Sequence, residues 1–140
     1  MKRLMGLDVG DKRIGVAVSD LLGMSAHAVE TVERQSFEKD INRIIELIDE
    51  KQVELLVVGL PKNMNNTLGP QGEKVQKFME KLLAKREIEV AYWDERLTTV
   101  AAHRTLIEGN MSRKKRKGVV DQIAAVFILQ GYLDMNRNKL

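Results

Sequence analysis

The chain has no cysteine, and this absence excludes several classes of protein at once. A disulfide scaffold, a zinc finger, an iron–sulfur centre and a cysteine nucleophile all require the missing thiol. No apolar run approaches the ~18 residues that a membrane span needs. Asp8 interrupts the apolar stretch near the N-terminus, so we expect no signal peptide. The sequence therefore predicts a cytoplasmic protein that does not engage a membrane.

Aromatic residues are also few, with one Trp, two Tyr and three Phe in 140 residues. Base stacking is therefore not expected to dominate any contact with nucleic acid. Tyr92 or Trp93, near Glu95, is a candidate for such stacking, but both are expected to belong to the core. The length suits one domain over residues 1–140, and a hydrophobic fraction of 44% is enough for a packed interior.

The net charge of +3 depends on one short segment. Without its five consecutive cations, acidic residues outnumber basic ones across the chain. Such a run is typical either of a solvated loop between helices or of a surface that contacts phosphates. The five cations are Arg113, Lys114, Lys115, Arg116 and Lys117.

The spacing of apolar residues predicts an α/β fold. Three strands are expected first, then helix, strand, helix, strand and two further helices, which indicates an antiparallel entry followed by parallel crossovers. Ser36 is expected to cap the first helix, and Pro70 to begin the second. The expected strands are 3–8, 14–19, 28–33, 55–58 and 88–93, and the last two helices are expected within 98–110 and over 119–133.

Three carboxylates occupy positions that packing alone does not favour. Asp8 ends an apolar strand, Glu95 follows the strand 88–93, and Asp121 lies in the expected first turn of the most apolar helix. Apolar surroundings disfavour a lone charged carboxylate. Each acid also has a structural alternative: turn hydrogen bonds for Asp8, pairing with Arg96 for Glu95, and the helix dipole for Asp121.

The three acids would repel one another if they met, unless a divalent cation joined them. The C-terminal ends of parallel strands share one edge of a sheet, which is where Asp8 and Glu95 would lie. Oxygen ligands without His or Cys suit Mg²⁺ or Mn²⁺. Two such ions can activate a water and stabilise a leaving oxygen in phosphodiester cleavage. His27 and His103 lack the spacing of metal ligands and are expected to be structural.

Four motifs, in order along the chain, resemble the YqgF family, also called the RuvX or Holliday junction resolvase-like proteins. They are LDVGDKRIGVA at 7–17, VGLPKNM at 58–64, DERLTT at 94–99 and VDQIAA at 120–125. The resemblance implies a ribonuclease H-like fold with a mixed five-stranded sheet, its first three strands antiparallel, flanked by helices. It also implies a metal-dependent nuclease that processes pre-16S rRNA in ribosome biogenesis, or, in an older proposal, cleaves four-way DNA junctions.

By motif position, the resemblance makes Asp8, Glu95 and Asp121 the acidic triad, with Asp8 bridging the metals. This chain departs from the pattern at two places. Many ribonuclease H-like enzymes carry an acid at the end of the fourth strand, whereas here that strand ends in Val58-Gly59 and Glu95 must supply the middle ligand. Asn65-Asn66 replaces a common Asp-Gly, and Asn tolerates the left-handed backbone that such a loop requires.

Further residues are expected to contact nucleic acid. Lys12 and Arg13 lie at the hairpin tip beside Asp8, and the alternative for them is an ordinary solvated turn. Asn63 would donate a hydrogen bond to the substrate, or else serve its own turn. Arg96 would orient Glu95 or meet the substrate. The five cations at 113–117 would add affinity that depends on salt and not on sequence.

Three classes of function stay open at this point. The favoured one is a nuclease acting on an RNA precursor, with ribosomal precursor particles as partners and either a monomer or a homodimer as the active form. Asp8-x-Gly10 before a hairpin also resembles the phosphate loop of actin- and sugar-kinase-like domains, but 140 residues supply one lobe and no P-loop motif is present. The third is a noncatalytic RNA-binding factor in ribosome maturation.

Overall fold

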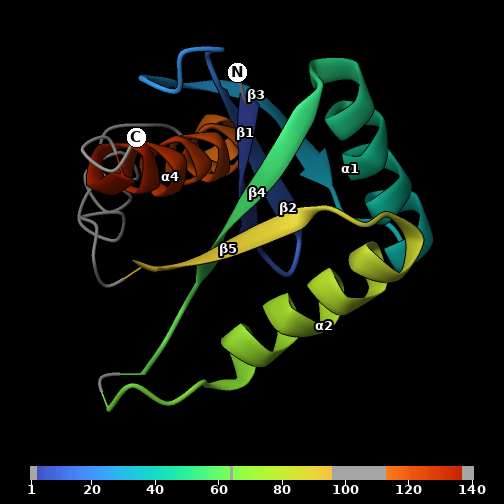
Figure 1. The fold of residues 1–140 in the computed structure, drawn as a ribbon. Coiled ribbons are helices and arrows are strands. Elements are labelled where there is room, and N and C mark those ends of the chain that lie inside the picture. Colours follow the sequence, from blue (N-terminus) through green and yellow to red (C-terminus); the bar gives the residue numbers. More distant parts are fainter. Residues whose placement is uncertain (1–2, 64, 96–112, 137–140) are drawn as a thin grey trace.

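The fold is built on a mixed five-stranded sheet with helices on both faces (Figure 1). The computed structural model describes residues 3–63, 65–95 and 113–136, with the side chains of 113–121 outside that description. Its elements are β1 (Arg3–Val9), β2 (Arg13–Ser19), β3 (Ala26–Glu33), α1 (Phe37–Lys51), β4 (Val53–Leu60), α2 (Pro70–Lys85), β5 (Glu89–Asp94) and α4 (Arg113–Asn136).

The strand order is β3-β2-β1-β4-β5, so the first strand of the chain is the middle strand of the sheet. β1, β2 and β3 pair antiparallel, whereas β4 joins β1 and β5 joins β4 in parallel. The expected antiparallel entry followed by parallel crossovers is confirmed. As a result, β1, β4 and β5 end at the same edge of the sheet.

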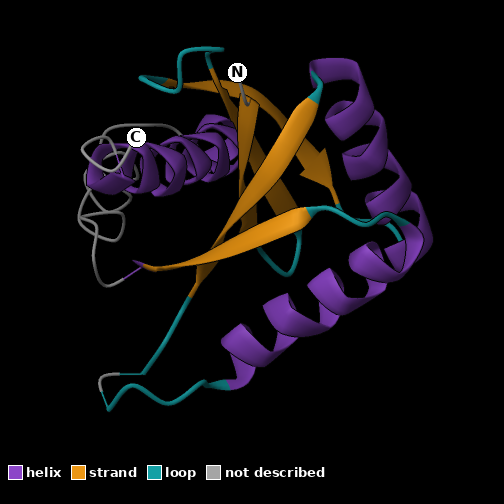
Figure 2. Ribbon diagram, viewed as in Figure 1, coloured by secondary structure: helices purple, strands orange, loops and turns teal. Residues whose placement is uncertain are grey.

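Helices α1 and α2 cover one face of the sheet, and α4 lies on the other (Figure 2). Met5, Leu7 and Val9 of β1 belong to the core under α1 and α2. Leu4, one residue out of phase with them, belongs to the smaller core under α4. Because successive side chains of a strand alternate between faces, Asp8 lies on the α4 face.

The two helices of the first face begin where the sequence predicts. The Ser36 hydroxyl accepts a hydrogen bond from the Lys39 N–H at 3.2 Å and caps α1. Pro70 is the first residue of α2, where its missing N–H leaves no hydrogen bond unmade. Both helices bury one apolar stripe against the sheet, as their period predicts.

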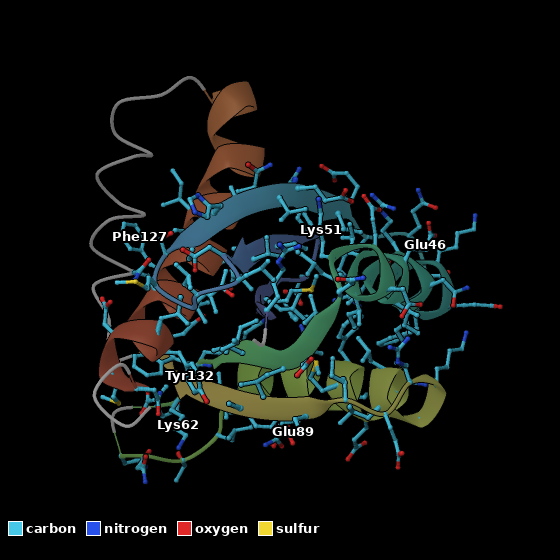
Figure 3. The ribbon with its side chains drawn as sticks, turned by 45° about the horizontal axis from the view of Figure 1, so that its top comes forward. Glu46, Lys51, Lys62, Glu89, Phe127 and Tyr132 are labelled. Atoms are coloured by element: carbon cyan, nitrogen blue, oxygen red, sulfur yellow. The ribbon has the colours of Figure 1, made fainter. Side chains whose placement is uncertain are left out.

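Helix α4 approaches the sheet closely because β1 carries a glycine beneath it. A β-carbon at Gly6 would lie 2.8 Å from the Ala125 carbonyl oxygen and 2.8 Å from the Leu129 β-carbon. Ile128 lies over Gly59 of β4, and the Tyr132 ring packs edge-on against Trp93 of β5 at 6.5 Å. The helix therefore crosses the sheet and reaches β5 with its later turns, as Figure 3 shows.

The hairpin after β1 is fixed to the start of α1 by one arginine. The Arg34 N–H donates to the Lys12 carbonyl, and its guanidinium donates to the Gly10 carbonyl, each at 2.9 Å. The same guanidinium donates to the Asp40 carboxylate at 3.1 Å. Asp40 is only 2% exposed, so this is a buried ion pair. The loop that follows Asp8 is thus held in place by tertiary contacts.

The expected start of the last helix is wrong. α4 is already helical at Arg113, six residues before the expected start at Val119. The five cations therefore occupy its first turns, and the alternative of a solvated loop is also wrong. Asp121 lies in the third turn of α4, so the helix-end dipole does not explain that acid. The helix expected within 98–110 lies outside the described residues.

None of the described helices is long and apolar enough to cross a membrane.

Candidate active site

Asp8 lies near the end of the central strand, half-buried on the α4 face. It pairs across the sheet with Gly15 of β2. On its other side, Leu7 pairs with Val58, so Gly59 is the β4 residue at the level of Asp8. Asp8 thus has a glycine at its level on each neighbouring strand. Because neither glycine has a side chain, no side chain from these two positions crowds the Asp8 carboxylate.

Glu95 reaches the same part of the sheet from β5. It follows the end of β5 and is half-buried. Its Oε1 atom lies 2.8 Å from the point that a β-carbon of Gly59 would occupy. The carboxylate is therefore over β4, on the α4 face, and beside the position of Asp8. Asp8 and Glu95 were expected to lie close together, and the position of the Glu95 carboxylate over Gly59 agrees with that expectation.

Asp121 comes from α4, and its side chain lies outside the described part of the structure. Its backbone position is nevertheless defined, one turn before Ala125 and two turns before Ile128. Ala125 approaches Gly6, and Ile128 approaches Gly59. Residues four and seven apart share one face of a helix, so position 121 is on the face that packs against the sheet.

The described side chains do not by themselves complete a metal site. Among them, no group of three or more His, Asp or Glu residues is arranged to hold an ion. Of the three expected donors, the structure describes the side chains of Asp8 and Glu95. The side chain of the third, Asp121, is outside the described part. The donors that are present are carboxylate oxygens, which fit a hard divalent cation such as Mg²⁺ or Mn²⁺.

The hairpin residues expected to contact phosphates differ in their surroundings. Lys12 is exposed at the tip. Arg13 is largely covered and donates to the Glu33 carboxylate of β3 at 3.0 Å. A phosphate contact by Arg13 would therefore have to compete with an existing ion pair. Both assignments stay predictions, and Lys12 is the better placed of the two.

Asn63 has a structural task in the loop between β4 and α2. Its side-chain amide donates to the Thr67 hydroxyl at 3.1 Å, and its N–H donates to the Thr67 carbonyl at 2.9 Å. Asn66 adopts a φ of 70°, as predicted for an asparagine in the place of glycine. The turn alternative for Asn63 is thus present in the structure, and its contact with nucleic acid stays a prediction.

The remaining expected contacts fall where side chains are not described. Arg96 lies outside the described residues. The side chains of Arg113, Lys114, Lys115, Arg116 and Lys117 also lie outside them, although their backbone is helical. Successive helix positions turn by about 100°, so five consecutive positions surround the axis and do not form one face.

The two aromatic residues before Glu95 occupy opposite faces of β5. Trp93 is 5% exposed and packs under α4, as expected. Tyr92 is 43% exposed, so its expected place in the core is wrong. β5 is an edge strand, and Tyr92 lies on its face opposite Trp93. Burial of part of the ring, with a smaller contribution from the charge of Glu80, raises the pKa of the Tyr92 hydroxyl.

Sequence reasoning did not identify two features of this site. Gly59 was noted only as a strand end without an acid, and its missing side chain is what leaves room for Glu95. The Trp93 indole N–H is buried and donates no hydrogen bond to any residue that the structure describes. A glycine inside an apolar run was the available signal for the first, since it often marks a close approach. The sequence carries no signal for the second.

A depression of about 290 Å³ lies elsewhere, between β3 and α1. Its lining includes Glu30, Asp40 and Arg43. These charges are already paired: Arg43 donates to both Glu30 oxygens, at 2.6 and 2.9 Å, and Asp40 is bonded to Arg34. The hydrogen bonds to Glu30 also raise the pKa of Arg43. The depression is on the α1 face, away from Asp8 and Glu95.

Comparison of the whole chain with known proteins finds relatives that are named as nucleases. The profile of the RuvX family, described as Holliday junction resolvase, matches residues 2–135. A relative from Clostridioides difficile strain 630 is 61% identical over 136 residues, covering 97% of this chain and 96% of its own. One from Clostridium tetani is 56% identical over 137 residues, covering 98% and 99%. Both bear the name "Putative pre-16S rRNA nuclease".

Two solved structures share the fold at low sequence identity. The RuvC protein of T. thermophilus in complex with a Holliday junction substrate is 14% identical, with a TM-score of 0.62 and 97% of each chain covered. The fowlpox virus Holliday junction resolvase is 15% identical, with a TM-score of 0.54 and 99% of each chain covered. The expected ribonuclease H-like fold is therefore confirmed.

Proposed function

Because the chain belongs to the RuvX family of Holliday junction resolvases, we propose that it is a hydrolase that cleaves phosphodiester bonds in nucleic acid with a divalent cation. One observation carries the proposal. The Glu95 carboxylate lies over Gly59 of β4, at the level that Asp8 occupies on the adjacent strand. Two acids drawn together on one face of a sheet repel each other, and a bound cation offsets that repulsion.

The cation would be held by Asp8, Glu95 and Asp121. Asp8 and the Gly59 position are about one strand spacing apart, ~4.8 Å, which a single ion between two carboxylates can span. When bound, Mg²⁺ or Mn²⁺ would supply a water of lowered pKa and positive charge near the leaving oxygen. Asp121 is on the helix face that packs against the sheet, which supports its place as the third ligand.

The protein's own groups would orient the substrate. Lys12 is exposed at the tip of the hairpin that follows Asp8, where it would contact a backbone phosphate. The hairpin is held by Arg34, so the lysine would be presented from a fixed loop. The cations at 113–117 would raise affinity for any polyanion, and the effect would weaken as salt rises. Arg96 and Asn63 are further candidates.

The substrate we favour is a precursor of 16S rRNA, bound as RNA or within a ribosomal precursor particle. The names of relatives that are 61% and 56% identical across nearly the whole chain support this choice. A four-way DNA junction is the second candidate, supported by the description of the family. We also propose that the protein acts in the cytoplasm, as a monomer or as a homodimer.

A cleavage assay on matched variants tests this function. The wild type would be compared with Asp8→Asn, Glu95→Gln and Asp121→Asn, and with Glu54→Gln as a control, since Glu54 is an exposed acid on β4. Substrates would be a pre-16S rRNA fragment, an unrelated single-stranded RNA and a four-way DNA junction, each with Mg²⁺, Mn²⁺ or EDTA. We expect each site variant to lose more than about 100-fold in rate, beyond what outer-shell changes cost.

The outcomes distinguish the candidates. Metal-dependent cutting that survives in Glu54→Gln and disappears in the three site variants would support the nuclease, and the preferred substrate would choose between RNA and DNA. Cleavage that persists in Asp8→Asn would contradict the site. Tight RNA binding without turnover, unchanged by all three substitutions, would favour a noncatalytic maturation factor.

A further inference from the structure

The space above Gly59 is filled by two side chains from elsewhere in the chain. A β-carbon added there would lie 2.5 Å from the Ile128 Cδ1 atom and 2.8 Å from the Glu95 Oε1 atom. Both distances are below the roughly 3.0 Å at which real β-carbons stop, so any residue other than glycine would move something. One of the two displaced groups belongs to the packing of α4, and the other to the proposed ligand set.

The position of Gly59 in the sheet explains why Glu95 can reach it. Gly59 pairs with Trp93 of β5, and Glu95 comes two residues after Trp93, directly after the end of β5. To lie over β4, the Glu95 side chain turns back across the neighbouring strand. That path is open because β4 has no side chain at this point on the α4 face.

We infer that Gly59 is a positioning residue for the proposed metal site, because its missing side chain lets Glu95, which follows β5, place its carboxylate over β4 beside Asp8. The inference rests on the proposed function of these two acids. It assigns a role to a residue that touches neither the metal nor the substrate. The role is steric, so it depends on the volume at position 59 and not on its polarity.

A second substitution separates this role from ordinary packing. Gly59→Ala alone crowds both Ile128 and Glu95. Ile128→Val removes the Cδ1 atom at 2.5 Å and leaves Cγ1, at 3.3 Å, as the nearest atom of that residue. The double variant therefore relieves most of the crowding against α4 and retains the crowding against Glu95.

The experiment measures Mn²⁺ binding and thermal stability on the same proteins. The proteins are the wild type, Gly59→Ala, Ile128→Val and the double variant. Gly72→Ala is a matched control, because its β-carbon would lie 2.8 Å from the Pro61 carbonyl oxygen and from Leu68, away from Glu95. Binding would be followed by calorimetry and by the fluorescence of Trp93, the single tryptophan of the chain.

We expect Gly59→Ala and the double variant to bind Mn²⁺ at least about 10-fold more weakly than the wild type, as for a misplaced ligand. Ile128→Val and Gly72→Ala should retain wild-type affinity. The double variant should melt close to Ile128→Val, which would show that the lost affinity is not a loss of folding. Cleavage rates at saturating Mn²⁺ should fall less than rates at low Mn²⁺.

Three results would overturn the inference. Wild-type Mn²⁺ affinity in both Gly59→Ala and the double variant would show that Glu95 does not need the space. Affinity lost in Gly59→Ala and fully restored by Ile128→Val would show that position 59 acts only through α4. A wild type that neither binds Mn²⁺ nor cleaves nucleic acid would instead refute the proposed function itself, and this inference with it.

Discussion

Replacing Arg34 with methionine would leave a buried carboxylate without its cation. Arg34 donates to Asp40 at 3.1 Å, and Asp40 is 2% exposed. The guanidinium also lies over the Phe37 and Phe78 rings, at 5.5 and 5.1 Å. Methionine keeps the unbranched apolar stem and removes the charge, so the change isolates the pairing as far as one substitution can.

The expected loss of stability from Arg34→Met is large. Removing one partner of a buried ion pair costs about 3–5 kcal/mol, because the other charge stays buried and uncompensated. For 140 residues the entropy of unfolding is about 0.3 kcal/mol per kelvin, so the melting temperature should fall by about 10–17 °C. Loss of the hydrogen bond from Arg34 to the Gly10 carbonyl acts in the same direction.

Arg43→Met supplies a matched control for this experiment. Arg43 pairs with Glu30, but their side chains are 37% and 30% exposed. A pair open to water contributes about 0–1 kcal/mol, so the control should melt within about 3 °C of the wild type. Free energies of unfolding would come from urea titrations followed by circular dichroism, with melting curves as a second measurement.

A third variant tests the cause of the loss. Arg34→Met combined with Asp40→Asn removes the stranded charge, while the asparagine oxygen can still accept from the Gln35 N–H, now bonded to Asp40 at 2.9 Å. We expect the double variant to be more stable than Arg34→Met alone. The reasoning would be refuted if Arg34→Met lost no more than Arg43→Met, or if adding Asp40→Asn lowered stability further.

Two other predictions follow from the packing of the sheet. Gly6→Ala should lower the free energy of unfolding by about 1–3 kcal/mol in urea titrations, because its β-carbon would lie 2.8 Å from the Ala125 carbonyl oxygen and force α4 outward; unchanged stability would contradict the close approach of α4. The Tyr92 hydroxyl should titrate above the ordinary value of about 10 in an ultraviolet difference titration against Tyr92→Phe, because burial and then Glu80 raise its pKa. Since the folded pKa is the higher one, stability should fall as pH rises above about 10, and Glu80→Gln should lower the Tyr92 pKa only in part.

Most of the fold could be predicted from local patterns. The continuous apolar run at 55–58 predicted a strand covered on both faces, and β4 is that strand. The start of α4 could not be predicted from apolar periodicity, because the segment before Val119 has no apolar residue between 113 and 117. Arg and Lys are good helix formers, so intrinsic propensity was the better guide there.

The candidate site was predictable to a lesser degree. Topology alone brings Asp8 and Glu95 to one edge, because the strands that precede them run parallel on either side of β4. The turn of Glu95 over Gly59 depends on a side-chain conformation that no spacing encodes. The faces of Tyr92 and Trp93 were likewise set by strand alternation at an open edge, where aromatic character does not determine burial.

The contact of Gly6 with Ala125 and Leu129 also sets the order in which the protein can assemble during its synthesis. About 120 residues separate Gly6 from Ala125, which covers it, and at ~5–20 residues per second a ribosome needs roughly 6–24 s to make them. Until the helix is made, Leu4 lacks the cover that buries it, and so do Val57 and Trp93 once they have been synthesised. A nascent chain stalled before α4 would therefore present an apolar sheet face to chaperones, and the proposed site could not act on RNA until translation of this helix was complete.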